Sequence, residues 1–178
     1  MAFGIFLLIF CVLAIKYAFV VVPEGYEYTL ERLGKFMRVL HPGFHIILPF
    51  FDMVGTKLNM KEQTLDIPPI EVLTKDEVLI RVGGSLLFQI QDSVNAAYQV
   101  RDLGGAILHV AETNIRTMVG QMTKEDFISK QDVVCYKLQN IMDEATVPWG
   151  TKIIRVKVWN MDSKPADPFE KPADYFSK

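Results

Sequence analysis

The first 22 residues form the most apolar run of the chain, and Lys16 is their only charged residue. A helix of this length would measure roughly 33 Å, and a bilayer core is roughly 30 Å thick. The pattern therefore predicts a transmembrane anchor over residues 1–22. Its membrane-embedded side chains are expected to include Phe3, Phe6, Leu7, Phe10, Leu13 and Phe19.

The residues that flank this run predict whether it is cleaved and in which direction it crosses the membrane. A cleaved signal peptide is the alternative interpretation, but such a peptide begins with basic residues and ends at small ones. Here no Lys or Arg precedes Lys16, and the run ends in Val20–Val22, which favours an uncleaved anchor. Because Lys and Arg follow the run and do not precede it, the positive-inside rule places residues 23 onward in the cytoplasm.

Alternation of apolar and polar residues predicts strands in the region that follows. It does so at residues 26–31, which precede a turn at residues 33–35, and most clearly at residues 78–91. Residues 42–51 are too apolar for a surface loop and too rich in proline for a central strand. We interpret them as a loop and edge strand close to the membrane, with Pro42, Gly43, Phe44, Pro49, Phe50 and Phe51 as its membrane-proximal residues.

Helical periodicity follows the strands. Asp92 or Ser93 is expected to cap a short helix that ends at Gly104–Gly105, and apolar stripes predict longer helices over residues 107–119 and 134–145. Thr123 and Asp126 form a capping-type pair between them. A last strand is predicted from Ile154, Val156 and Val158. Strands followed by helices predict an α+β fold, in which an antiparallel sheet packs against helices.

The last part of the chain, residues 161–178, carries the tetrapeptide Lys-Pro-Ala-Asp twice. Its prolines prevent a continuous helix, so we expect a disordered, proline-rich tail. Between the anchor and this tail lies a single domain over residues 23–160, whose first part is expected to end near residue 91 and whose second part covers residues 92–160.

Composition and motifs give little sign of chemistry. The 178 residues include 19 Lys and Arg against 21 Asp and Glu, a balance that argues against nucleic-acid binding by electrostatic attraction. Cys11 and Cys135 are far apart, and His41 and His45 flank a Pro-Gly pair, so no metal site is expected. The phosphate loop, the nucleophile elbow and the zinc-binding His-Glu-x-x-His motif are missing from the sequence. We therefore predict no catalytic, metal-binding or cofactor-binding residues.

Several motifs together resemble the SPFH or band 7 superfamily of stomatins, prohibitins and flotillins, with most similarity to its bacterial stomatin-like branch. They occur in family order and at approximately the family's spacing over residues 22–158. The motifs are Val22–Tyr26, Leu30–Phe36, His41–His45, Leu48–Asp52, Leu65–Pro68, Thr74–Asp76, Asn114–Thr117, Val119–Gly120 and Asp143–Gly150.

The resemblance implies a non-enzymatic scaffold that assembles side by side on a membrane and organises lipid microdomains. The expected partners are membrane lipids, further SPFH proteins as homo- or hetero-oligomer, and an NfeD-type membrane protein or a membrane protease. The expected location is a bacterial inner membrane, crossed once. Asp76, Arg116 and Lys157 are the candidate subunit-interface residues that the resemblance suggests.

Departures from the family pattern also carry expectations. In bacterial relatives a long coiled-coil helix follows the domain, whereas the proline-rich tail follows it here, so we do not expect this chain alone to build the wall of a cage. Gly83 stands where relatives often have Asp, Gln131 where they often have Arg, and Lys157 where they often have Glu. These differences should remove or alter charged contacts between subunits. The pair Gly83–Gly84 is expected to loosen its strand by roughly 0.5–1 kcal/mol per glycine.

Two alternatives to the scaffold remain open from the sequence. One is a monomeric or small-oligomer module that regulates a full-length SPFH assembly or a membrane protease, with the tail as its binding element. The other is a membrane serine hydrolase that would use Ser85 or Ser129.

Overall fold

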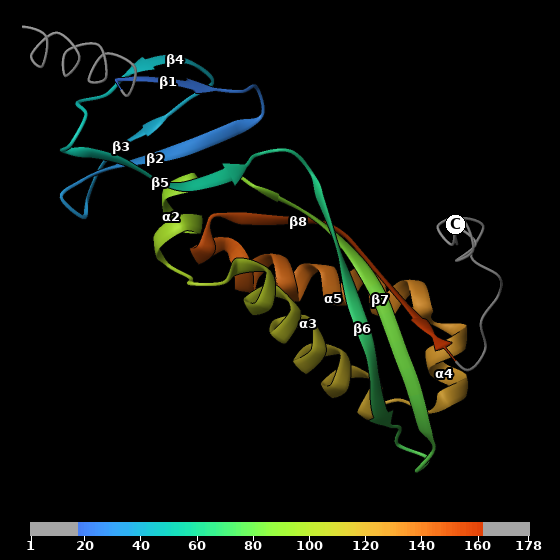
Figure 1. Ribbon diagram of the computed structural model, residues 1–178. Coiled ribbons are helices and arrows are strands. Elements are labelled where there is room, and N and C mark those ends of the chain that lie inside the picture. Colours follow the sequence, from blue (N-terminus) through green and yellow to red (C-terminus); the bar gives the residue numbers. More distant parts are fainter. Residues whose placement is uncertain (1–17, 162–178) are drawn as a thin grey trace, which may run out of the picture.

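The structure, a computed structural model, describes residues 18–161 (Figure 1). Five strands near the start of the chain form a small unit. Its elements are β1 (Phe19–Val22), β2 (Tyr26–Arg32), β3 (Lys35–Leu40), β4 (Gly43–Ile46) and β5 (Asp52–Asn59). Strands β1 and β4 pair as a two-stranded antiparallel sheet, and β3, β2 and β5 form a three-stranded sheet in that order. The two sheets enclose a small core of Val22, Leu30, Leu40 and Ile47.

A larger unit follows, in which helices cover one face of a three-stranded antiparallel sheet (Figure 1). The sheet has the order β6–β7–β8, and its main core lies between β7 and the helices α3 and α5. The elements of this unit are β6 (Gln63–Leu73), β7 (Leu79–Ile90), α2 (Ser93–Tyr98), α3 (Leu103–Gly120), α4 (Lys124–Ser129), α5 (Gln131–Thr146), the 3-10 helix η1 (Val147–Trp149) and β8 (Thr151–Asn160).

The predicted α+β class is confirmed, as are most of the patterned elements. The alternation at residues 78–91 corresponds to β7, in which Ile80, Val82, Leu86, Phe88 and Ile90 are buried. Asp92 caps α2, and the Thr123 hydroxyl accepts from the backbone N–H of Asp126 at the start of α4. The predicted division near residue 91 falls between β7 and α2, inside the larger core.

One helix boundary and one strand face differ from the prediction. Gly104 and Gly105 do not end a helix but lie in the first turn of α3, because the carboxylate of Asp102 caps that helix by accepting from Gly105 N–H at 3.1 Å. In β8 the register shifts opposite Leu87 and Phe88, so Ile153 is buried in place of Ile154. A bulge of this kind breaks simple alternation. Strands β3, β5 and β6 were not predicted.

The helix predicted over residues 1–22 does not extend to its last residues. Phe19–Val22 form β1, whose residues pair with β4 in the register Phe19 to Ile46 and Val22 to Gly43. The β-branched Val20–Val22 favour this pleated conformation. Residues 1–17, with the predicted membrane positions Phe3, Phe6, Leu7, Phe10 and Leu13, lie outside the described residues, as does the predicted tail after Met161. Within residues 18–161, none of the helices is long and apolar enough to cross a bilayer.

Contacts through α2 join the two units. The hydroxyl of Tyr98 donates to Glu31 of β2 at 2.8 Å, and its ring lies edge-on to Phe36 with centroids 5.5 Å apart. Gln89 of β7 adds a hydrogen bond to the carbonyl oxygen of Met60 at 2.9 Å. The small unit is thereby attached at one end of the long sheet, whereas the tip of the β6–β7 hairpin lies at the other end (Figure 1).

Candidate apolar contact surface

The two-stranded sheet β1–β4 has one packed face and one exposed apolar face. Residues that face each other across an antiparallel pair project on the same side, and the pairs Phe19–Ile46 and Val21–Phe44 do so here. All four of these side chains are exposed, and the rings of Phe19 and Phe44 lie 5.2 Å apart. On the opposite side, Val22 and Val20 pack against the small core. We call the exposed side the apolar face.

Two turns beside this face also present large apolar side chains to solvent. Leu33 follows β2 and is 81% exposed, and Phe50 precedes β5 and is 78% exposed. The turns touch, since the backbone N–H of Leu33 donates to the carbonyl oxygen of Phe51 at 3.3 Å. Phe51 itself is also exposed. The apolar face and these two turns together form the candidate contact surface.

The backbone at both turns is unfavourable for the residues that occupy it. Leu33 has φ 52° and Phe50 has φ 76°, in the left-handed region that costs roughly 1–2 kcal/mol per residue with a side chain. In a hairpin turn with positive φ at two successive residues, as at Leu33 and Gly34, Asn-Gly is the preferred pair. Local folding therefore does not account for an exposed Leu or Phe at these positions, and such strain commonly marks functional sites.

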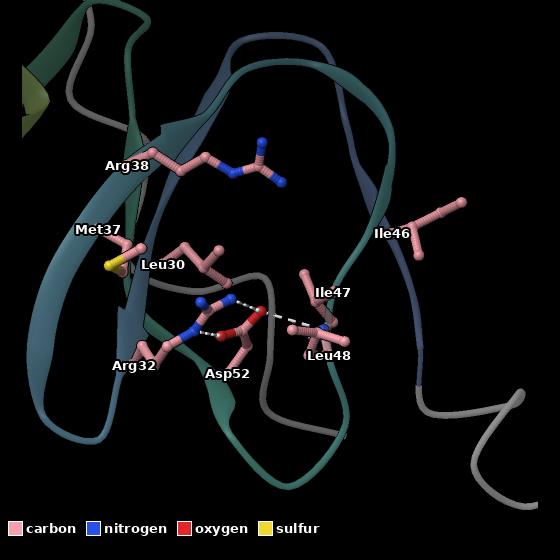
Figure 2. Close-up of a pocket in the computed structure, with 8 residues that line it drawn as sticks. All are labelled: Leu30, Arg32, Met37, Arg38, Ile46, Ile47, Leu48 and Asp52. Atoms are coloured by element: carbon pink, nitrogen blue, oxygen red, sulfur yellow. Dashed lines mark hydrogen bonds and ion pairs between the residues drawn. The ribbon is translucent and has the colours of Figure 1, made fainter.

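A partly buried ion pair fixes the loop that carries Phe50. The Nε of Arg32 donates to Oδ1 of Asp52 at 2.6 Å, its Nη2 donates to Oδ2 at 3.2 Å, and Leu48 N–H donates to Oδ2 at 3.0 Å (Figure 2). The Arg32 guanidinium and the Leu48 N–H hold the pKa of Asp52 below its ordinary value. The Asp52 side chain is only 3% exposed, so this clamp ties the end of the loop to β2.

A hollow of about 350 Å³ lies above the clamp (Figure 2). Its wall is mostly apolar and includes side chains beside the contact surface. The lining residues are Leu30, Arg32, Met37, Arg38, Ile46, Ile47, Leu48 and Asp52.

Three of the six predicted membrane-proximal residues, Phe44, Phe50 and Phe51, lie on this surface. Pro42, Gly43, Phe44, Phe50 and Phe51 are exposed, whereas Pro49 is half-buried. Ile46 and Leu48 are as exposed as these residues and lie within the predicted membrane-proximal segment, although they were not named in it. Val21 and Leu33 are also exposed, and the sequence interpretation did not place them on this surface. Val21 was missed because its face depends on pairing with β4, a strand more than 20 residues away.

The three candidate subunit-interface residues have different surroundings. Asp76 serves the fold, since it accepts from the Thr74 hydroxyl at 2.5 Å and from Lys124 N–H at 3.3 Å. These hydrogen bonds lower its pKa and tie the β6–β7 turn to α4. Arg116 on α3 and Lys157 on β8 are exposed.

Two polar side chains of α5 hold the outer edge of β8. Gln139 Nε2 donates to the carbonyl oxygen of Ile154 at 2.8 Å, and Gln131 Nε2 donates to that of Val158. Gln131, which was expected to alter contacts between subunits, thus forms a contact within the chain. Because an uncovered strand edge invites pairing with other chains, this cover directs any assembly away from edge-to-edge strand addition at β8.

The residues that could carry catalysis have structural surroundings in the part of the chain that the structure describes. The Ser129 hydroxyl donates to the carbonyl oxygen of Asp126 at 3.3 Å, and Ser85 lies half-buried in β7. Cys135 is half-buried against β8, and burial raises the pKa of its thiol. Among residues 18–161, His, Cys, Asp and Glu do not gather in any group of three that could hold a metal ion.

The chain matches a known protein family over most of its length. Residues 20–166 match the model of the SPFH domain / Band 7 family. An uncharacterised protein of Methanothermobacter thermautotrophicus is 35% identical over 159 residues, which cover 89% of this chain and 49% of that protein. A stomatin homolog of Pyrococcus horikoshii is 34% identical over 158 residues, 89% of this chain and 58% of the homolog.

A shorter relative provides the fullest overlap of the three. This uncharacterised protein of Methanocaldococcus jannaschii is 33% identical over 160 residues, which cover 90% of this chain and 80% of the relative. The chain thus spans between about half and four fifths of the length of these relatives. The family model covers most of the chain, and the matched residues include the contact surface except Phe19 and nearly all of both units of the fold. The chain belongs to the SPFH domain / Band 7 family.

Proposed function

We propose that this protein is a stomatin-like membrane scaffold whose contact surface lies within the interfacial layer of a bilayer, with the long sheet and its helices held above it. The strained, exposed turn residues Leu33 and Phe50 are the observation that carries this proposal. Burial in an apolar environment would offset the backbone strain and remove the exposure of both side chains, because burying one such side chain stabilises by about 1.5–3 kcal/mol. Membership of a family that includes stomatin homologs supports the proposal.

The apolar face continues directly from the N-terminal run. Because β1 begins at Phe19, the anchor predicted for the preceding residues would leave the bilayer next to the contact surface. The anchor would then hold the protein on the membrane, and the contact surface would set its depth and tilt. The single crossing, the cytoplasmic side and the expected NfeD-type or protease partners remain predictions of the sequence.

Side-by-side assembly, the second part of the proposal, would use the open face of the long sheet. On this face the side of β6 carries Asp66 and Glu71, and the side of β8 carries Lys152, Arg155 and Lys157. A basic side and an acidic side on one chain suit a head-to-tail contact, which repeats and closes into rings when its rotation allows.

Depth-dependent fluorescence quenching tests the membrane contact. Single-cysteine variants labelled with an environment-sensitive dye at Phe51→Cys and at Leu79→Cys would be reconstituted in vesicles that contain doxyl-labelled lipids. Leu79 is the matched control, because it is as exposed as Phe51 but lies near the tip of the β6–β7 hairpin. We expect quenching at position 51 and not at position 79. Equal quenching at both positions, or none at position 51, would overturn the proposed orientation.

Particle mass in mild detergent tests the assembly. Lys157→Glu should shift large particles to smaller ones, and combining it with Asp66→Lys should restore them, since attraction across the contact is re-created with reversed signs. If the unaltered chain gives only monomers or dimers, both alone and with a full-length relative, the monomeric regulatory module becomes the better description.

A further inference from the structure

The hollow above the Arg32–Asp52 clamp combines an apolar wall with a net positive charge. Arg32 and Asp52 neutralise each other, and the Leu48 N–H adds a further hydrogen bond to Asp52. Arg38 is the remaining charged residue of the lining; its charge helps to lower the pKa of Asp52, but among residues 18–161 it forms no hydrogen bond or ion pair. Its guanidinium extends from β3 over the hollow, away from the clamp (Figure 2).

The position of the hollow indicates which ligand the Arg38 guanidinium could bind. Ile46 belongs both to the lining and to the apolar face, and Leu48 and Met37 of the lining are exposed beside it. If the contact surface enters the membrane as proposed above, the hollow lies at the level of the lipid headgroups. A guanidinium forms paired hydrogen bonds with phosphate oxygens, and the apolar wall suits the glycerol backbone and the first carbons of an acyl chain.

We propose that this hollow binds one anionic phospholipid of the membrane, with its phosphate on Arg38 and its upper acyl chain against Met37, Ile46 and Leu48. The inference rests on the proposed membrane contact and adds a lipid preference to it. A net negative headgroup is favoured over a zwitterionic one, because the hollow offers a single positive charge and Asp52, the only acid among its described lining residues, is already paired.

The test uses the full chain in nanodiscs of phosphatidylcholine that contain increasing fractions of phosphatidylglycerol. Methyl NMR signals of Ile46 and Ile47 report on the hollow, and those of Ile80 and Ile115, which are buried in the larger core, report on the fold. We expect the first pair of signals to shift saturably with the phosphatidylglycerol fraction and the second pair to stay unchanged.

Two charge-removing variants on the same strand separate a site from general attraction. Arg38→Gln should raise the phosphatidylglycerol fraction needed for half of the shift about fivefold. Lys35→Gln is the matched control: it removes the same charge from β3, but Lys35 does not line the hollow, so the midpoint should stay the same. Equal effects of the two variants would overturn the proposal.

Two further measurements distinguish the phosphate of a lipid headgroup from free inorganic phosphate. Inorganic phosphate added to pure phosphatidylcholine discs should leave the Ile46 and Ile47 signals in place, and a full shift there would replace the lipid by a free anion. If phosphatidylglycerol produces no shift while the dye at position 51 is quenched, the lipid site is refuted and the membrane contact stands. If that dye is not quenched, the proposed function itself fails.

Discussion

The adjacent glycines of β7 offer a sharp test of how closely the long sheet is packed. Gly84 faces Val158 and Gly83 faces Trp159 across the β7–β8 ladder. A Cβ at position 84 would lie 2.4 Å from the carbonyl oxygen of Lys157 and 3.3 Å from Cα of Val158. Both are backbone atoms of a paired strand, so no side-chain rotation can relieve the clash. A Cβ at position 83 would instead meet Met161 Sδ at 3.4 Å and the carbonyl oxygen of Ile67 at 3.7 Å.

These contacts predict opposite effects of the same substitution. Carbon and oxygen atoms in adjacent strands normally approach to roughly 3.3 Å, so Gly84→Ala must move β8 by roughly 0.9 Å. Overpacking of this kind costs about 1–3 kcal/mol, and the lower chain entropy of Ala returns about 0.5–1 kcal/mol. We expect Gly84→Ala to destabilise by about 1–2 kcal/mol and Gly83→Ala to stabilise by about 0.5–1 kcal/mol. The sequence had suggested an equal cost at both glycines.

Thermal unfolding of the full chain in mild detergent, followed by far-ultraviolet circular dichroism, measures the difference. At about 2–4 °C per kcal/mol for a chain of this size, the two midpoints should differ by roughly 3–12 °C. Each variant is the control for the other, because both add one methyl group to the same strand. If Gly84→Ala unfolds at or above the midpoint of Gly83→Ala, the close approach of β7 and β8 is not present in the protein.

Four further predictions concern single side chains. Leu33→Asn should stabilise the small unit by about 1 kcal/mol because Asn tolerates positive φ, whereas Leu33→Ala should not stabilise it. Equal thermal unfolding midpoints for the two variants would argue against backbone strain at residue 33. The pKa of Asp52 is lower in the folded than in the unfolded chain, so its contribution to folding stability is full above about pH 4 and disappears as the pH falls through the folded-state pKa. The difference in thermal unfolding midpoint between the native chain and Asp52→Asn should therefore shrink on acidification. A difference that stays constant with pH would contradict this. Gln139→Leu should cost about 1–2 kcal/mol because the Ile154 carbonyl loses its donor, which denaturant unfolding would detect. Cys135 should react with iodoacetamide more slowly in the folded than in the unfolded chain of a Cys11→Ser variant, because burial raises its thiol pKa; equal rates would place it in solvent.

Local patterns were sufficient for much of the fold. Alternation located β2 and β7, and helical spacing located α3 and α5, because each of these elements buries one face along its own length. The capping roles of Asp92 and Thr123 also followed from residue type and spacing. The family motifs added the domain identity, which the family match confirms.

Local patterns could not predict which strands pair when these strands are far apart in the sequence. The residues of β1 share their composition with the apolar run before them, and only the register with β4 decides that Val21 and Phe44 project outward on one face. The same holds for the hollow, whose lining comes from β2, β3, β4 and the loop before β5.

The sequence by itself thus determined which segments are strands or helices where periodicity is strong, and which residues near position 50 are apolar enough to be of interest. Tertiary structure decided that Leu33 and Phe50 are held in adjacent turns, that Arg38 is left as the unpaired charge of the hollow, and that Gly84 is required by its neighbour strand. The physical reason is that periodicity reports burial along one element, whereas register, strain and charge pairing depend on residues brought together from distant parts of the chain.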